Sequence, residues 1–246
     1  MRTVLKTRSV SLFVLAALIA VFGLLAISCD DGGNGESAYL GTTTLTLSGQ
    51  VWTVNWADGT SREFNGNRTV TSNRLGGSGA ITNGQLNFTI DTPSSLESIE
   101  RSFSYWLERH TDLNISNPSA RMALLGLYTG TQAYLDRGWV SVSDTQEVHE
   151  LVIYIYVDRD VSITGTGTTS GAYTSTNFNL NLREGWNVFY EKHEGRLSGE
   201  QWNWTISYSL NNPSHLRWLL DEGGYSGNIN TYSEANKNPA RSFFRR

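Results

Sequence analysis

Alternation of apolar and polar residues with a period of two recurs along the chain and constrains its fold more than any other feature. Trp202, Trp204 and Ile206, for example, alternate with polar residues at positions 203, 205 and 207. Apolar residues at every second position line one face of a β-strand. The dipeptides Asp58-Gly59 and Asn83-Gly84 are typical of tight turns between such strands. The pattern therefore predicts an all-β fold.

The number of short strands favours one mainly antiparallel β-sandwich over residues 44–222, because Gly- and Asn-containing turns separate them. Two smaller β domains that meet near Pro118 are the alternative. Residues 151–157 are apolar at both odd and even positions, so we expect this strand in the centre of a sheet. The phase of the alternation changes near Gly49, which predicts a β-bulge or a break there.

Two segments have helical patterns. Ser94 and Glu97 have the spacing of a capping box, and apolar residues from position 96 to 107 recur every three or four residues. This predicts one amphipathic helix near 94–110, inserted between strands. A second, short helix is expected after Asn212, carrying the leucines at positions 216, 219 and 220.

Residues 78–90 and 170–182 resemble each other at a constant offset, with identical residues at five positions. A two-stranded motif that was duplicated would explain the similarity. Chance resemblance between two β-rich segments is the alternative.

The first 28 residues have the pattern of a secretory signal peptide. Three basic residues and no acidic one precede an apolar run from Val10 to Ile27. An uncleaved transmembrane helix is the alternative, since about 18 apolar residues can just span a bilayer. The residue that follows the signal, Cys29, favours cleavage.

Cys29, the single cysteine of the chain, ends the run Leu25-Ala26-Ile27-Ser28-Cys29. This run resembles the relaxed lipobox of spirochaete lipoproteins, in which signal peptidase II cuts before a lipidated cysteine. The resemblance implies that Cys29 carries acyl chains, which hold the N-terminus at a membrane. The polar, glycine-rich residues 29–43 are then expected to form a flexible tether.

Several phrases of the remaining chain are similar to those of uncharacterised lipoproteins of spirochaetes, especially treponemes. These phrases are residues 47–52, 79–90, 156–161 and 180–187. The resemblance implies a protein of the cell envelope, anchored to the inner or outer membrane. It brings no assigned activity and no site residues. Residues 223–246, rich in Gly, Asn and Ser, are expected to form a loose tail.

Charge and composition exclude several functions. The chain has 19 basic and 23 acidic side chains, and removal of the signal leaves 16 against 23, a net charge of −7. Such a chain lacks the broad basic surface that binding to nucleic acid requires. One cysteine excludes an internal disulfide and a multi-cysteine zinc site. We expect no metal and no cofactor.

The eight tryptophans include two pairs that share a sheet face. Trp52 and Trp56 form one pair, and Trp202 and Trp204 the other. Sugar rings stack on exposed indoles, so each pair is a candidate glycan-binding site. Apolar neighbours on the same face favour the alternative, in which the indoles pack in the core.

Acidic residues offer two further candidates. Glu191, Glu194 and Glu200 lie near one another in the sequence, and a carboxylate pair held roughly 5–9.5 Å apart hydrolyses glycosides. Asp158 and Asp160 flank Arg159 and could bind calcium. Solvated strand-end charges and a surface ion pair are the alternatives.

We therefore expect a non-enzymatic interaction or structural module at the cell envelope, held on the membrane by the lipid at Cys29, with a protein or glycan as its partner. The alternative is a carbohydrate-active protein, either a binding module or a glycosidase.

Overall fold

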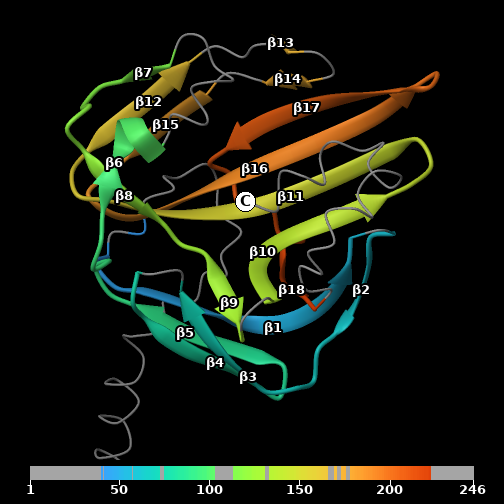
Figure 1. The fold of residues 1–246 in the computed structure, drawn as a ribbon, viewed down its shortest axis with the longest axis horizontal. Helices are drawn as coiled ribbons and strands as arrows, with labels where there is room; N and C mark the ends of the chain where they lie inside the picture. The colour runs from blue at the N-terminus through green and yellow to red at the C-terminus, as the bar shows by residue number, and fades with distance from the viewer. Residues whose placement is uncertain are drawn as a thin grey trace, which may run out of the picture. The chain divides into compact units, whose positions relative to one another are not determined.

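The computed structural model describes residues 40, 42–56, 58–72, 75–102, 113–130, 133–165, 169–170, 173–175 and 178–222. Strands dominate this part of the chain, which confirms the prediction of an all-β fold (Figure 1). Most strand pairs are antiparallel, with parallel pairs between β1 and β18 and between β14 and β17. The signal peptide (1–28), Cys29, nearly all of the tether and the tail (223–246) lie outside the described residues.

Seven of the described strands close into a barrel, in the order β9-β10-β18-β1-β5-β4-β3 and back to β9. Their bounds are β1 (Leu45–Asn55), β3 (Arg68–Ser72), β4 (Ser78–Thr82), β5 (Gln85–Ile90), β9 (Leu127–Thr129), β10 (Ala133–Val142) and β18 (Arg217–Asp221). The barrel replaces the sandwich expected from the sequence. Closure depends on β18, which pairs with β1 on one edge and β10 on the other.

A large sheet continues from the barrel, because the first half of β10 pairs with β9 and its second half with β11 (Gln146–Val157). β11 pairs along its whole length with β16 (Gly185–Ser198), and β16 pairs with β17 (Gln201–Ser209). The prediction that residues 151–157 form a central strand is confirmed. The remaining strands of this sheet are β2 (Thr60–Glu63), β6 (Glu97–Ser98), β8 (Arg121–Leu124), β13 (Thr169–Ser170) and β14 (Tyr173–Ser175).

A smaller sheet contains β7 (Asn114–Ile115), β12 (Val161–Gly165) and β15 (Phe178–Leu182). Its apolar residues join one face of β11 and β16 in a second core, which includes Ile155, Ile163 and Phe189. The main core fills the barrel and continues onto the opposite face of β11 and β16. The described residues from Leu40 to Glu222 all belong to one compact unit.

β1 contains no bulge near Gly49, contrary to the prediction. Its pairing with β5 runs without interruption from Leu45 to Gln50. Leu47 and Val51 point into the barrel, whereas Val54 belongs to a small apolar cluster on the outer side. The phase of the alternation changes because β1 first buries one face in the barrel core and then, near its end, the other face in the outer cluster. Gly49 itself, with φ of +140°, gives room to the Trp218 ring, which a Cβ would approach within 3.1 Å.

The second predicted helix is a strand. Residues 217–221 form β18, which has neighbours on both edges. Leu220 lies in the barrel core, and Leu219 lies in the outer cluster. Both faces of the strand are therefore apolar, and this produced a leucine spacing that also fits a helix.

The first predicted helix begins later than expected. Glu97 and Ser98 form β6 and pair with β8, and residues 99–102 are helical. Positions 103–112 lie outside the described residues, so they do not show how far this helix extends. The predicted capping box is wrong, because Glu97 pairs with β8 as part of β6 and does not lie in the first turn of the helix.

The internal similarity is not a repeated structural motif. β4 and β5 pair with each other as a hairpin, whereas the corresponding strands β14 and β15 belong to different sheets. Similar alternation in two segments therefore does not produce the same pairing.

Candidate functional site

One row of side chains crosses four neighbouring strands of the large sheet. The register places Trp139 of β10 opposite Glu150 of β11, Glu150 opposite Lys192 of β16, and Lys192 opposite Ser207 of β17. Residues opposite each other in adjacent strands lie on the same sheet face. The row therefore presents an aromatic ring, a carboxylate, an ammonium group and a hydroxyl side by side.

Ionic contacts connect this row. A hydrogen bond joins His215 Nε2 and Glu150 Oε2, and the Trp139 and His215 rings meet edge to face with centroids 5.1 Å apart. Lys192 Nζ lies 3.9 Å from Glu150 Oε1 and 3.1 Å from Glu194 Oε2. Glu150 in the row and Glu194 beside it are thus each in contact with a basic side chain.

Glu194 is also contacted by a second cation. Arg196 Nε donates to Glu194 Oε1 at 2.8 Å. Hydrogen bonds from Arg196 and then from Lys192 lower the pKa of Glu194 below its ordinary value. This carboxylate is therefore held in its ionised form.

A cleft of about 240 Å³ opens beside the row, under the connection from β17 to β18. Its polar lining comes from Glu150, Glu191, Lys192, Ser207, Ser209, Asn211 and Asn212. Tyr190, Pro213 and Leu216 add apolar surface. We call this site the β17–β18 cleft.

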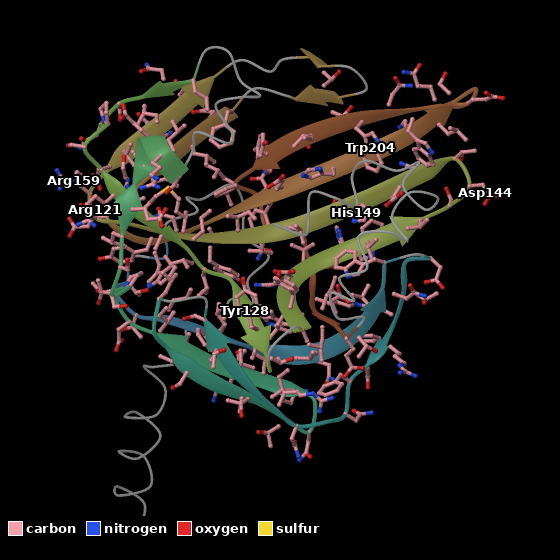
Figure 2. All side chains as sticks on the ribbon, viewed as in Figure 1. Arg121, Tyr128, Asp144, His149, Arg159 and Trp204 are labelled. Carbon is pink, nitrogen blue, oxygen red and sulfur yellow. The ribbon has the colours of Figure 1, made fainter. Side chains whose placement is uncertain are left out.

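The other face of β11 and β16 carries a buried polar cluster. His149 and His193 lie directly opposite each other, and each imidazole Nε2 hydrogen-bonds with the glutamate two positions before it, Glu147 and Glu191. The four side chains are at most 9% exposed. We call this set the Glu–His cluster. Figure 2 shows His149 on β11.

Aromatic and aliphatic residues surround the Glu–His cluster. The Trp56 ring stacks on His149 with centroids 5.6 Å apart and an angle of 6° between the planes. Val140 lies opposite His149, and Ile206 lies opposite His193. Buried ionisable groups in such surroundings depend on one another for hydrogen bonding.

The predicted catalytic glutamates do not come together on one surface. Glu191 belongs to the buried Glu–His cluster, and Glu194 lies on the opposite face with Lys192. Glu200 is exposed in the turn between β16 and β17. Positions 191 and 194 are an odd number of residues apart in one strand, so they point to opposite faces.

The four tryptophans predicted as glycan-binding candidates are buried or partly buried. Trp204 is labelled in Figure 2. It is 1% exposed, lies on Gly195 and stacks with Trp202 with ring centroids 5.9 Å apart. Trp52 and Trp56 pack against the outer cluster of Val54, Val140 and Leu219. The guanidinium of Arg217 lies 4.1 Å from the centroid of the Trp52 ring. Core packing therefore describes these four residues best.

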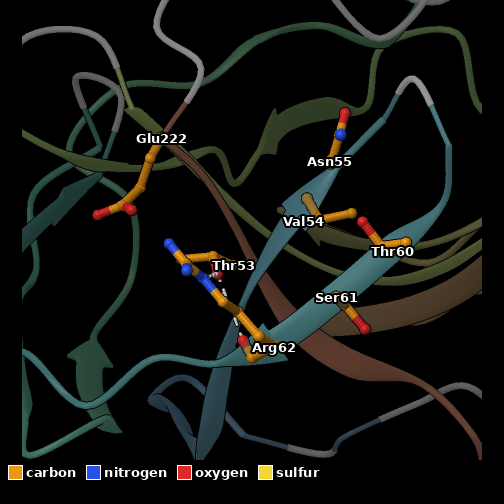
Figure 3. A pocket seen from close by; sticks show the side chains of 7 residues that line it. All are labelled: Thr53, Val54, Asn55, Thr60, Ser61, Arg62 and Glu222. Carbon is orange, nitrogen blue, oxygen red and sulfur yellow. Dashed lines mark hydrogen bonds between the residues drawn. The ribbon is translucent and has the colours of Figure 1, made fainter.

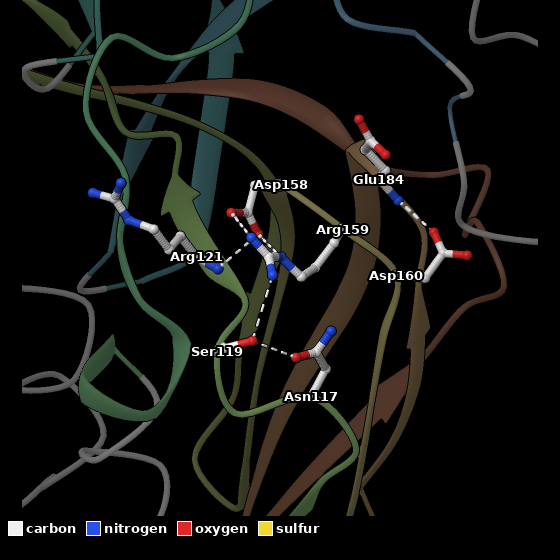
Figure 4. A network of polar contacts seen from close by, with 7 residues as sticks. All are labelled: Asn117, Ser119, Arg121, Asp158, Arg159, Asp160 and Glu184. Carbon is white, nitrogen blue, oxygen red and sulfur yellow. Dashed lines mark hydrogen bonds and ion pairs between the residues drawn. The ribbon is translucent and has the colours of Figure 1, made fainter.

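Asp158 and Asp160 bind protein groups (Figure 4). Arg159 pairs with Asp158 at 3.1 Å, and the Arg121 backbone N–H donates to the same carboxylate. Burial raises the pKa of Asp158, but hydrogen bonds from Arg159 and Arg121 lower it overall. Asp160 accepts from the backbone N–H of Glu184 at 2.8 Å. The geometry supports the ion pair rather than a calcium site.

A second cleft, of about 460 Å³, lies beside the hairpin of β1 and β2 (Figure 3). Arg62 and Glu222 flank it, and Arg62 Nε donates to Thr53 Oγ1 at 3.3 Å. Glu222 also pairs with Arg68 at 3.0 Å. Val54 is the only apolar residue among the described residues that line this second cleft, and its polar side chains are mostly exposed. The β17–β18 cleft includes the partly buried Glu150, Lys192 and Ser207 and more apolar surface, so it is the better candidate.

Asp136 on β10 has a strongly perturbed carboxyl group. Burial raises its pKa to about 6, and the negative charge of Asp221 acts in the same direction. The Tyr128 and Tyr134 rings lie nearby at 5.0 Å, and burial raises the pKa of Tyr128. This group affects the pH dependence of stability.

Within the described residues, no three His, Cys, Asp or Glu side chains are arranged to hold a metal ion. The same part of the chain contains no helix with the length and hydropathy needed to cross a bilayer. No family model, curated protein or solved structure matches this chain.

Sequence reasoning missed Trp139, Glu150, Lys192 and His215. The register of β10, β11 and β16 brings the first three together, and the connection from β17 to β18 places His215 against Glu150. The Glu–His cluster did leave a signal. The pattern Glu-x-His occurs at positions 147–149 and 191–193, in two runs that both alternate.

Proposed function

We propose that this chain is a lipid-anchored protein of the cell envelope whose β domain binds a ligand without converting it. The lipobox-like run at Cys29 supports the anchor. The observation that carries the binding function is the β17–β18 cleft, where side chains from three strands and one connection converge. Concave sites with a few convergent polar groups are the usual form of ligand-binding sites.

The charges beside the cleft support binding rather than catalysis. A glycosidase needs a carboxylic acid with a raised pKa to protonate the leaving group. Hydrogen bonds from Arg196 and Lys192 lower the pKa of Glu194, which is the opposite of what a general acid needs. Glu150 is in contact with two basic side chains, His215 and Lys192.

Lipid attachment is tested with Cys29→Ala in cells labelled with radioactive palmitate. We expect the wild-type protein to incorporate label and to fractionate with membranes, and the variant to lose both properties. Ser198→Ala, a change at an exposed position, serves as the control. Unchanged labelling and membrane partition of the cysteine variant would contradict the anchor.

A further inference from the structure

Charged side chains in and beside the β17–β18 cleft pair with one another, with Glu150 and Lys192 in its lining and Glu194, Arg196 and His215 beside it. Glu150 and Glu194 share Lys192, and His215 and Arg196 contact one carboxylate each. A charged ligand would have to replace one of these contacts, leaving another charge without its counterion. Such a replacement is costly where groups are partly shielded from water, as Glu150 is at 15% exposure. The arrangement therefore favours a neutral ligand.

The same groups retain capacity for hydrogen bonding. A lysine ammonium has three donors, and a carboxylate offers about four acceptor positions. Ser207, Asn211 and Asn212 add hydroxyl and amide groups to the lining. Ser209 Oγ accepts from the Asn211 backbone N–H at 3.0 Å, which leaves its own O–H as a donor. Donors and acceptors are thus mixed along one wall, as a ligand with many hydroxyl groups requires.

Size and apolar surface limit the ligand further. The cleft holds about 240 Å³, which is below the range of roughly 300–1,000 Å³ typical of sites for drug-sized molecules. Pro213 and Leu216 contribute apolar surface on which C–H groups pack. A single pyranose ring combines hydroxyl groups at its edge with C–H groups on its face.

We propose that the β17–β18 cleft binds one neutral sugar residue, free or at the end of a neutral glycan. This inference rests on the proposed binding function and names the ligand class for its site. Lys192, Ser207 and Asn211 donate to sugar hydroxyls, and Glu150 accepts from them. The ion pairs within the cleft stay intact when the sugar binds.

The test uses the full chain in a polyoxyethylene detergent, because glucoside and maltoside detergents have neutral sugar headgroups. The protein is applied to an array of neutral, sialylated and sulfated glycans and of peptides. Binding of methyl glucoside, methyl galactoside, methyl mannoside and N-acetylglucosamine is then measured by calorimetry. We expect one neutral sugar class to bind with little dependence on salt.

Ser207→Ala and Asn211→Ala are expected to weaken this binding by roughly three- to tenfold each, the loss typical of one hydrogen bond. Ser198→Ala, at the far end of β16, should leave it unchanged. Thermal unfolding of all variants checks that the fold is retained.

The other outcomes separate the two proposals. Binding of a charged glycan or a peptide that Ser207→Ala weakens would overturn the neutral sugar and leave the binding function standing. If Ser207→Ala and Asn211→Ala weaken the binding of none of the ligands tested, the binding function of the cleft is overturned as well.

Discussion

Individual residues show how the environment decides the role of an ionisable group in this protein. Glu191 and Glu194 are three positions apart, yet one is buried with His193 and the other contacts Lys192 and Arg196 at the opposite face. Their chemistry differs because strand geometry sends them to different surroundings. Two predictions belong to this scale.

The first prediction concerns Asp136, whose pKa is raised to about 6 in the folded protein. An unfolded aspartate titrates near pH 3.9, so between about pH 4 and pH 6 the folded state binds more protons. Stability from this group is therefore present at low pH and is lost as the pH rises through 6. Asp136→Asn should raise the free energy of unfolding at pH 7.5 by about 1–3 kcal/mol, because a pKa difference of about two corresponds to about 3 kcal/mol.

Urea denaturation at pH 7.5 and at pH 4 measures this effect. The stabilising difference between Asp136→Asn and the wild type should shrink at the lower pH, where the carboxyl group is protonated in the folded state and about half protonated in the unfolded state. A variant that is equally stabilised at both values would show that the pKa of Asp136 is not the cause.

The second prediction concerns the Glu–His cluster. Glu147→Ala removes the carboxylate that holds His149 Nε2 at 2.5 Å and leaves a buried imidazole without this partner. We expect a loss of about 2–4 kcal/mol in the free energy of unfolding. Glu147→Gln keeps an acceptor and should cost less. Glu200→Ala, in an exposed turn, should change stability by no more than about 0.5 kcal/mol.

At the scale of elements, β18 shows why local pattern is insufficient. Leu219 and Leu220 are consecutive and both buried, because β18 separates the barrel core from the outer cluster. The same spacing of leucines suits one face of a helix. Pairing with β1 and β10 decides between these structures, since it satisfies the backbone groups on both edges of the strand.

The third prediction therefore tests β18 as a barrel strand. Leu220→Ala should lower the free energy of unfolding by about 2–4 kcal/mol, because a fully buried leucine leaves a cavity when it is truncated. Ser61→Ala, on the exposed strand β2, is the control and should have little effect. Amide hydrogen exchange of residues 218–220 should be slow in the wild type. Rapid exchange there would argue against pairing on both edges.

For the whole molecule, continuity of the sheet is the main feature. β8, which follows Pro118, pairs with β11, and β7, which precedes it, pairs with β12. Ala120 between them is fully buried, and its backbone N–H donates to Asn117 O at 3.0 Å. The two sides of Pro118 are thus connected through the sheets and the second core.

The fourth prediction follows from this continuity. Limited proteolysis should not produce a stable pair of fragments separated near Pro118, because cleavage there would expose the second core on both sides. Denaturation should occur in one transition when it is followed by both tryptophan fluorescence and circular dichroism. A stable fragment that ends near Pro118 would indicate two independent domains.

The sequence by itself determined the all-β class, the central position of residues 151–157 and the positions of the Asp-Gly and Asn-Gly turns, because period-two alternation and turn residues act locally. It also contains the lipobox-like run on which the proposed anchor rests. Only the tertiary structure decided that β18 closes a barrel and that Trp139, Glu150 and Lys192 form one row. These features depend on register between strands distant in the chain. A shift of one residue would reverse every side chain, and alternation alone does not specify which strands pair.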